Sequence, residues 1–331
     1  MIITRTPYRL SFFGGGTDYN AWFEKNGGMV VGSAFSKYCW ISVRKLPPFF
    51  NYKTRFVYSR TEEVAENIQL IHPGAVSCLK YLQMTDGMEI HHDGDLPAHS
   101  GIGSSSSFTV GFLLALYSYQ QKMMGKKDLA MTAIEVEQKV EKQNVGIQDQ
   151  IFASYGGMQI IEMGPGPEFH VSPLILPADY KNHFKSHVLL GFSGFARFAT
   201  DSARAQIQNI EKGKVESQMK EILGICKEAV QGLTQNCDMK ELGRLIHKTW
   251  LLKRTLSDSV TNSELDLLYD KAIKAGAYGG RLLGAGQGGF FMFFAPPERH
   301  QKIKEALASI KVWVPFEVDE EGSKVILCSE D

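Results

Sequence analysis

The sequence lacks an excess of charge of either sign, because its 36 Lys and Arg residues balance its 36 Asp and Glu residues. A protein that binds nucleic acid needs a basic surface, and so does one held on an anionic membrane. We therefore expect neither nucleic acid nor a membrane as a partner. An anionic small molecule stays open, since a single pocket needs only a few local cations.

Paired cysteines are also lacking. The chain has five cysteines, an odd number, and no C-x-x-C spacing, which is typical of reduced thiols in a cytoplasmic protein. Cys39 and Cys328 lie in apolar runs, so we expect both to be buried. The N-terminus has no signal-peptide pattern, and the apolar stretch at 108–119 is too short to cross a bilayer. These features predict a cytoplasmic location.

No internal repeat or low-complexity segment interrupts the 331 residues, which are enough for two domains. Helical and strand patterns alternate in both halves, which favours an α+β fold. The segment 162–167 is the expected linker, and it divides the chain into domains 1–165 and 166–331. We expect strands at 1–13, 27–45 (as pairs with glycine turns), 88–92 and 290–294, and helices at 61–83, 108–124, 128–143, 201–236, 238–256, 263–275 and 297–309.

A serine- and glycine-rich loop, Pro97-Ala-His-Ser-Gly-Ile-Gly-Ser-Ser-Ser-Ser107, lies between an expected strand and an expected helix. Backbone N–H groups at a helix start lack internal partners and carry partial positive charge, and glycines let the backbone approach a ligand. The loop therefore suits phosphate oxygens. It is neither a Walker A loop nor a Rossmann fingerprint, which fails at Ser106. A serine-capped helix without a ligand is the alternative.

Two carboxylates follow this loop. On the helix expected at 128–143, with Asp128 as its N-cap, Glu137 falls among apolar residues on the inward face. An inward carboxylate needs a cation or strong donors, so it predicts either a Mg²⁺ ligand or a buried pair with Arg or Lys. Asp149 follows a helix break and could accept or orient the proton of an attacking hydroxyl. A turn aspartate that caps the next segment is the alternative there.

The N-terminal strand carries Arg9 among apolar positions and runs into a glycine turn, Gly14-Gly-Gly-Thr-Asp18. An arginine at such a place could stabilise charge on a transferring phosphoryl group. Asp18 could accept hydrogen bonds from sugar hydroxyls. A hairpin that carries a surface ion pair is the alternative for both residues.

These segments together resemble the motifs of the GHMP small-molecule kinases. Residues 97–106 resemble P-x-x-x-G-L-G-S-S-[AS], with isoleucine in place of leucine, and residues 146–150 resemble G-I-M-D-Q. Residues 8–19 resemble the galactokinase-type motif G-R-V-N-L-I-G-E-H-T-D-Y, and residues 283–289 resemble the third family motif. The resemblance implies an S5-like N-terminal domain and a ferredoxin-like C-terminal domain, with ATP bound between them.

The resemblance also implies roles for single residues. Asp149 would be the catalytic carboxylate, Arg9 would stabilise the transition state, and Ser105 and Glu137 would bind Mg²⁺. The ATP phosphates would lie against Pro97, Gly101, Ile102, Gly103, Ser104, Ser105, Ser106 and Ser107. The substrate would contact Gly15, Gly16, Thr17, Asp18, Arg197 and Lys253, with Arg281 as a further candidate for a sugar phosphate, while Gly284, Gly286, Gly288 and Gly289 would form a structural glycine motif.

One departure concerns the sugar site. Galactokinase-type motifs carry Glu-His where this chain has Gly15-Gly16, which leaves room for a larger or phosphorylated sugar. The runs at 5–18, 193–197 and 247–253 resemble D-glycero-D-manno-heptose 7-phosphate kinases. This implies phosphorylation of the anomeric hydroxyl to heptose 1,7-bisphosphate, for the nucleotide-heptose of lipopolysaccharide or capsule. The alternatives are a fucose-, arabinose- or galactose-type sugar kinase, or a silent sensor of ATP and sugar. The oligomeric state stays open.

Overall fold

The two longest strands, β1 (Ile2–Phe13) and β2 (Gly28–Lys45), pair antiparallel along most of their length. The computed structural model describes residues 1–194 and 200–329. One edge of β2 serves two neighbours, because its first third pairs with β6 (Met158–Met163) and its last third with β5 (Met88–Gly94). The eight-stranded sheet has the order β12-β1-β2-β5-β3-β4, with β7 paired to β6, and it includes β3 (Thr54–Val57), β4 (Thr61–Val64), β7 (Phe169–Pro173) and β12 (Lys324–Cys328).

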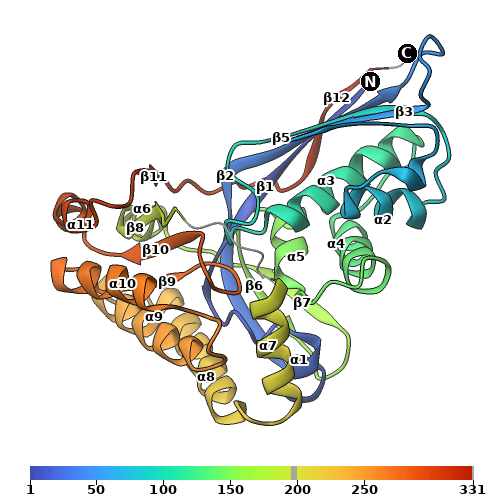
Figure 1. The fold of residues 1–331 in the computed structure, drawn as a ribbon. Coiled ribbons are helices and arrows are strands. Elements are labelled where there is room, and N and C mark those ends of the chain that lie inside the picture. Colours follow the sequence, from blue (N-terminus) through green and yellow to red (C-terminus); the bar gives the residue numbers. More distant parts are fainter. Residues whose placement is uncertain (195–199, 330–331) are drawn as a thin grey trace.

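Helices cover one face of this sheet (Figure 1). The central one, α3 (Ser104–Tyr119), packs on both β1 and β2, and it is buried from Ser106 to Leu116. A helix that is apolar on all sides belongs in a core, which explains why this segment carries so few polar residues after its serine run. The other helical segments of this part are α1 (Asn20–Asn26), η1 (Asn67–Gln69), α2 (Pro73–Tyr81), α4 (Lys126–Glu135), a π-helical turn (Val136–Val140) and α5 (Gln148–Tyr155).

A second, four-stranded sheet is antiparallel throughout and has the order β11-β8-β10-β9. Its β-α-β-β-α-β connection is that of a ferredoxin-like fold. The predicted strand of phenylalanines forms β10 (Phe290–Phe294) at the centre, and all five residues are buried. The remaining elements are α6 (Ala178–His187), β8 (Val188–Phe192), α7 (Thr200–Glu211), α8 (Glu216–Thr234), α9 (Met239–Arg254), α10 (Ser263–Ala275), β9 (Gly279–Leu282), η3 (Pro297–Arg299), α11 (His300–Ala306) and β11 (Val312–Val314).

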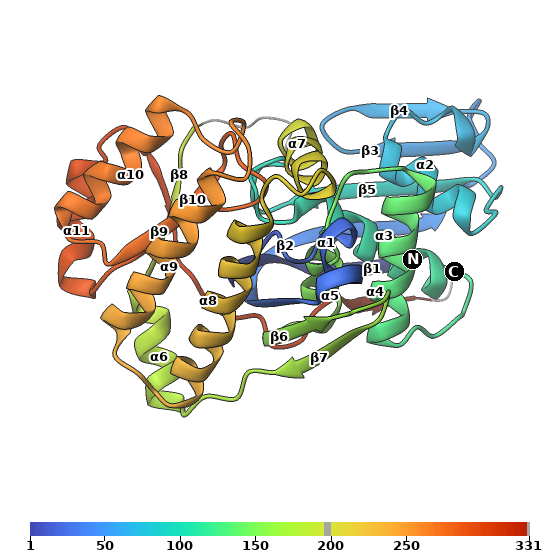
Figure 2. The same ribbon diagram turned by 90° about the horizontal axis from the view of Figure 1, so that it is seen from below.

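The two sheets lie side by side (Figure 2), and one hydrophobic cluster includes residues of both. The Phe184 ring bridges them, because its centroid lies 5.1 Å from that of Phe12 in β1 and 5.2 Å from that of Phe294 in β10. The chain also returns to the first sheet, where β12 pairs with the start of β1. The predicted α+β class and the ferredoxin-like second half are confirmed. The domain division at residues 165 and 166 stays a prediction.

Several predicted segments are wrong in ways that tertiary contacts explain. Residues 28–45 form one strand and not a pair, because Gly32 does not turn the chain. A Cβ at Gly32 would lie 2.5 Å from the Leu10 carbonyl oxygen and 2.7 Å from the Phe152 ring. The helix expected at 61–83 starts only at Pro73, where His72 caps it, since residues 61–64 pair with β3.

The expected linker at 162–167 forms the turn of the β6–β7 hairpin, in which Met163 pairs with Phe169. The helix expected at 128–143 begins earlier and ends at Val140 in the π-helical turn, so Asp128 lies in its first turn and Gly125 is the N-cap. The segment 201–236 is two helices separated at Gly213, and the glycine-rich stretch 276–289 contains β9. The helix expected at 297–309 is the shorter pair η3 and α11.

The five cysteines are free thiols. Cys39 is buried as predicted, but Cys328 is exposed, because it lies on β12 at the edge of the sheet. In the described ranges, none of the helices is long and apolar enough to cross a membrane.

Candidate active site

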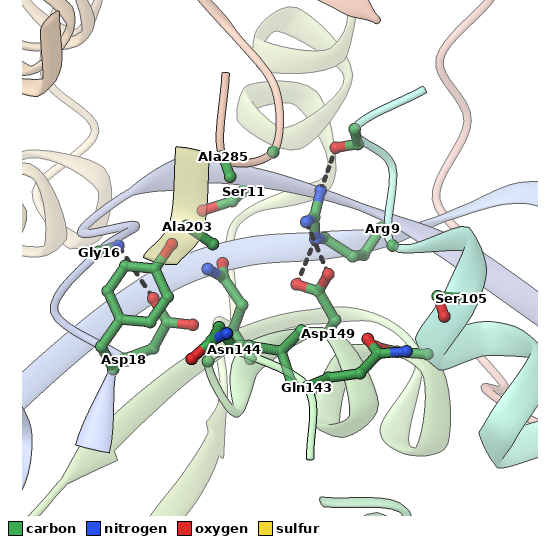
Figure 3. Close-up of a pocket in the computed structure, with 18 of the residues that line it drawn as sticks. Arg9, Ser11, Gly16, Asp18, Ser105, Gln143, Asn144, Asp149, Ala203 and Ala285 are labelled. Atoms are coloured by element: carbon green, nitrogen blue, oxygen red, sulfur yellow. Dashed lines mark hydrogen bonds and ion pairs between the residues drawn. The ribbon is translucent and has the colours of Figure 1, made fainter. Parts of the chain in front are cut away.

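A cavity opens where the first sheet, the start of α3, the start of α5 and the loop after β9 meet (Figure 3). Among the described residues, the Lys, Arg, Asp and Glu side chains of its wall are three cations, Arg9, Lys253 and Arg281, and two carboxylates, Asp18 and Asp149. The wall therefore carries more positive than negative groups. The predicted residues Gly16, Gly101, Gly103, Ser104, Ser105, Ser106 and Gly284 also line this cavity.

Arg9 and Asp149 form a two-pronged ion pair in the middle of this cavity (Figure 3). The Arg9 Nε donates to one carboxylate oxygen at 2.7 Å and its Nη2 donates to the other at 2.8 Å. Arg9 Nη1 donates to the Gly101 carbonyl oxygen at 2.6 Å, which ties the pair to the serine-glycine loop. Such parallel hydrogen bonds fix both groups in orientation. The Asp149 carboxylate thus pairs with Arg9, and the alternative prediction that it caps the next segment is wrong.

The start of α3 presents serines to the cavity. Gly103 precedes the helix with a left-handed φ of 76°, and Ser104 is the first helical residue. Ser105 is exposed and Ser106 is buried, yet both line the cavity. Ile102 is buried, Pro97 is exposed and accepts a hydrogen bond from Ser100, and the Ser107 hydroxyl donates to the Pro7 carbonyl oxygen at 2.9 Å. Backbone N–H groups of the first helical turn are thus available to an anion.

The two glycine motifs pack against each other. Gly101 has a φ of 81°, and a Cβ there would lie 2.4 Å from the Leu283 carbonyl oxygen. A Cβ at Gly284 would lie 2.7 Å from the Gly101 Cα, and one at Gly289 would lie 2.2 Å from the Ser100 carbonyl oxygen. We call this contact between residues 100–101 and 283–289 the glycine seam. Gly286 packs in the same way on Val260, and Gly288 has a φ of 144°.

Glu137 is fully buried, which confirms its predicted inward orientation. Its Oε2 accepts hydrogen bonds from Ser106 Oγ at 3.0 Å and from Gln150 Nε2 at 2.5 Å. Its Oε1 has no hydrogen-bond partner, and within the described ranges it makes no ion pair with Lys or Arg. Burial raises the pKa of Glu137 to about 7, although the hydrogen bonds from Gln150 and Ser106 lower it. The predicted alternative of a buried Glu–Arg or Glu–Lys pair is therefore wrong.

The glycine turn after β1 holds Asp18 at the cavity wall. Asp18 is buried, and its Oδ1 accepts a hydrogen bond from the Gly16 N–H at 2.9 Å. Burial raises its pKa. A Cβ at Gly146 would lie 1.9 Å from Asp18 Oδ2, so only glycine fits there. Thr17 points away into the fold, where its hydroxyl donates to the Gly14 and Met29 carbonyl oxygens.

Two buried cations complete the wall. Lys253 on α9 donates from Nζ to the Gly284 carbonyl oxygen at 2.6 Å, and burial lowers its pKa well below the ordinary value. Arg281 on β9 lies against Gly15 and is almost fully buried. Gly15 itself does not belong to the cavity wall. Arg197, predicted to bind substrate, lies outside the described residues.

Some residues of the site were missed from the sequence. Gln150, which donates to Glu137 behind the cavity wall, lies in the segment that resembles G-I-M-D-Q, so this motif was the available signal. Gln143 and Asn144 reach the wall from the loop after the π-helical turn, and no local pattern marks them (Figure 3). Ala203 comes from α7, which the fold brings over the cavity from a distant part of the chain.

The fold, the helix start and the ion pair at the cavity centre define a phosphotransferase. The model of the GHMP kinases N terminal domain matches residues 70–157, and that of the GHMP kinases C terminal domain matches residues 227–311. Together these matches cover more than half of the chain. The chain belongs to the GHMP kinases, which use ATP as co-substrate, so the predicted resemblance is confirmed.

Known proteins are similar over the whole chain. D-glycero-alpha-D-manno-heptose 7-phosphate kinase from Campylobacter jejuni is 28% identical, and the match covers 98% of each protein. Galactokinase from Pyrococcus furiosus is 23% identical, with 92% of each covered. The crystal structure of D-glycero-D-manno-heptose 1-phosphate kinase from Bacteroides thetaiotaomicron is 21% identical and matches with a TM-score of 0.80 over all of both chains. That structural likeness shows the shared fold.

Proposed function

We propose that this kinase transfers the γ-phosphoryl group of ATP to the anomeric hydroxyl of D-glycero-D-manno-heptose 7-phosphate, giving heptose 1,7-bisphosphate. The observation that carries this proposal is the Arg9–Asp149 pair beside the α3 start, in a cavity with more cations than carboxylates. The similarity to the heptose 7-phosphate kinase of Campylobacter jejuni, over 98% of both chains, supports this sugar. The product would feed nucleotide-heptose synthesis for lipopolysaccharide or capsule, in the cytoplasm.

In this mechanism the serine-glycine loop and the first N–H groups of α3 hold the ATP phosphates. The anomeric oxygen forms a bond to the γ-phosphorus, and the bond from that phosphorus to the bridging oxygen of ADP breaks. The hydroxyl proton passes to the Asp149 carboxylate, which lies 23% exposed at the cavity. Arg9 already bridges Asp149 and Gly101, so its guanidinium lies where it can stabilise charge on the transferring group.

Mg²⁺ fits the residues beneath the serines. Glu137 is a fully buried carboxylate whose Oε1 lacks a partner, and burial of such a group favours a nearby cation. Among the described residues no cluster of three or more His, Cys, Asp or Glu side chains could hold a metal. Mg²⁺ uses one or two carboxylates together with substrate phosphates. We propose Glu137 and Ser105 as its protein ligands, and the bound ion would neutralise charge on the phosphates. In the structure Ser106 is the serine that donates to Glu137, and Glu137 lies behind the cavity wall, so this pair would have to come together around the ion.

The sugar would lie on the other side of the ion pair. Asp18 would accept hydrogen bonds from its hydroxyls at the turn that includes Gly16 and Thr17, and Lys253 would contact its anionic part. We also propose that residues 1–165 and 166–331 act as the two domains that meet around this cavity.

The test is ADP release with ATP and Mg²⁺ against a panel of acceptors. The panel contains D-glycero-D-manno-heptose 7-phosphate, mannose, fucose, arabinose, galactose and mevalonate. Turnover with the heptose phosphate alone is expected. Turnover with a free sugar instead would keep the kinase and reject the heptose. Measurable ATP binding without turnover of any acceptor would favour the silent sensor.

A further inference from the structure

Arg281 is a buried cation that forms no ion pair with a carboxylate of the described residues, although Asp18 lies near enough to raise its pKa. Its side chain is 1% exposed and lines the cavity, and Nη1 makes a long hydrogen bond of 3.3 Å to the Phe12 carbonyl oxygen. The Nε has no hydrogen-bond partner, and no carboxylate of the described ranges forms an ion pair with the guanidinium. Burial and the neighbouring Arg9 lower its pKa to about 10, so it stays charged at neutral pH. A buried, unpaired charge is costly unless a ligand compensates it.

The missing side chain at Gly15 keeps this guanidinium free. A Cβ at Gly15 would lie 3.0 Å from Arg281 Nη2 and 3.6 Å from Nη1. Galactokinase-type motifs carry glutamate at this position, and a carboxylate so placed would pair with Arg281. Gly15 is not in the left-handed region, so other residues fit its backbone. The glycine therefore leaves space beside a cation.

Two further buried donors lie at the same part of the wall. Lys253 is 4% exposed, and its Nζ donates a hydrogen bond to the neutral Gly284 carbonyl oxygen. The Ser11 hydroxyl is 3% exposed and has no hydrogen-bond partner. A Cβ at Gly15 would lie 3.2 Å from Ser11 Oγ and 3.0 Å from Arg281 Nη2, so both groups border the space that the glycine leaves. Figure 3 shows Ser11 and Ser105 on opposite sides of the Arg9–Asp149 pair.

We propose that Arg281, Lys253 and Ser11 form an anion subsite for the phosphate already carried by the sugar, and that Gly15 keeps it open by withholding an acidic side chain. This subsite adds a phosphate-binding role to the proposed function, and the identity of the sugar rests on that function. A phosphate dianion would supply the negative charge that balances these cations, and it would accept a hydrogen bond from the Ser11 hydroxyl.

The test compares Gly15→Glu with its neutral match Gly15→Gln in the full-length protein. The two side chains have nearly the same size, so their difference isolates the charge beside Arg281. We expect Gly15→Glu to bind D-glycero-D-manno-heptose 7-phosphate roughly 10–100-fold more weakly than Gly15→Gln, the range for a lost hydrogen-bonded charge. The two variants should bind unphosphorylated heptose within about threefold of each other and ATP equally, as measured by calorimetric titration.

Equal affinities of the two variants for the heptose phosphate would overturn the subsite, and so would equal losses for phosphorylated and unphosphorylated heptose. Failure of the proposed substrate is seen separately, as wild-type protein that binds ATP but not the heptose phosphate. In that case inorganic phosphate is the probe. A phosphate-dependent rise in Tm for Gly15→Gln that Gly15→Glu lacks would support the subsite, and identical rises would overturn it.

Discussion

The close packing of the glycine seam allows us to predict how much free energy of unfolding is lost when a methyl group is added at Gly101. Gly101→Ala places a methyl group 2.4 Å from the Leu283 carbonyl oxygen, on a residue with a φ of 81°. Gly213→Ala is a matched control, because Gly213 has a φ of 68° and a Cβ there meets nothing within 4 Å. Both changes impose the same left-handed backbone on alanine. Only the first also forces the seam apart.

The expected losses follow from these two contributions. A left-handed conformation costs an alanine roughly 1–2 kcal/mol, which is the whole effect expected for Gly213→Ala. Forcing a methyl group into a packed contact adds roughly 1–3 kcal/mol. Gly101→Ala should therefore lose about 2–5 kcal/mol, a large part of the 5–15 kcal/mol typical of a folded domain. The ATP affinity should fall as well, because the displaced residue belongs to the serine-glycine loop.

Urea denaturation of both variants, with linear extrapolation to water, measures the two free energies of unfolding. ATP titration of the folded variants measures the expected fall in ATP affinity. The reasoning would be refuted if both variants lost the same free energy within about 0.5 kcal/mol, since the seam would then yield without cost. Normal ATP affinity in Gly101→Ala would show that the loop does not depend on the seam.

The remaining predictions concern single side chains. Asp149→Asn should lower turnover by roughly 10²–10⁴-fold and leave ATP binding intact, and unchanged turnover would reject its role. Glu137→Gln should raise the Mg²⁺ concentration needed for half-maximal rate, whereas a normal titration would move the metal elsewhere. Burial and His72 lower the pKa of His92 from 6.5 to about 4. Between these pH values the unfolded chain therefore binds more protons than the folded protein. The free energy of unfolding should then fall by up to about 3 kcal/mol as pH drops from 6.5 to 4. His92→Phe, which keeps the contact with Phe108, should flatten this pH dependence, and an unchanged slope in urea denaturation would assign it to other groups.

The parts of the fold that the sequence predicted are those with a local signal. The phenylalanine run at 290–294 forms a buried central strand, and the helix at 263–275 has the predicted bounds. Glu137 faces inward because helical periodicity places it among apolar side chains. The wrongly predicted segments lack such a signal. Residues 61–64 form strand β4 because they pair with β3, and Gly32 lies within a strand against the Phe152 ring of a helix that is distant in the sequence.

The candidate site divides in the same way. The residue types of the serine-glycine loop, of Arg9 and of Asp149 were readable from motifs, but not the pairing of Arg9 with Asp149 across 140 positions. The structure also brings Ser106, and not Ser105, to Glu137. Neighbouring residues on a helix point about 100° apart, so the packing of α3 on the sheet decides which serine faces inward.

The sequence by itself determined the chemistry available to this protein: a glycine-rich helix start that suits phosphate, two carboxylates that suit metal binding and proton transfer, and an arginine on a buried strand. Only the tertiary structure decided which of these groups meet. It closed the glycine seam between residues 100–101 and 283–289, and it left Arg281 unpaired beside Gly15. The physical reason is that local patterns encode the face of an element, whereas contacts between distant segments depend on how closely two backbones can pack.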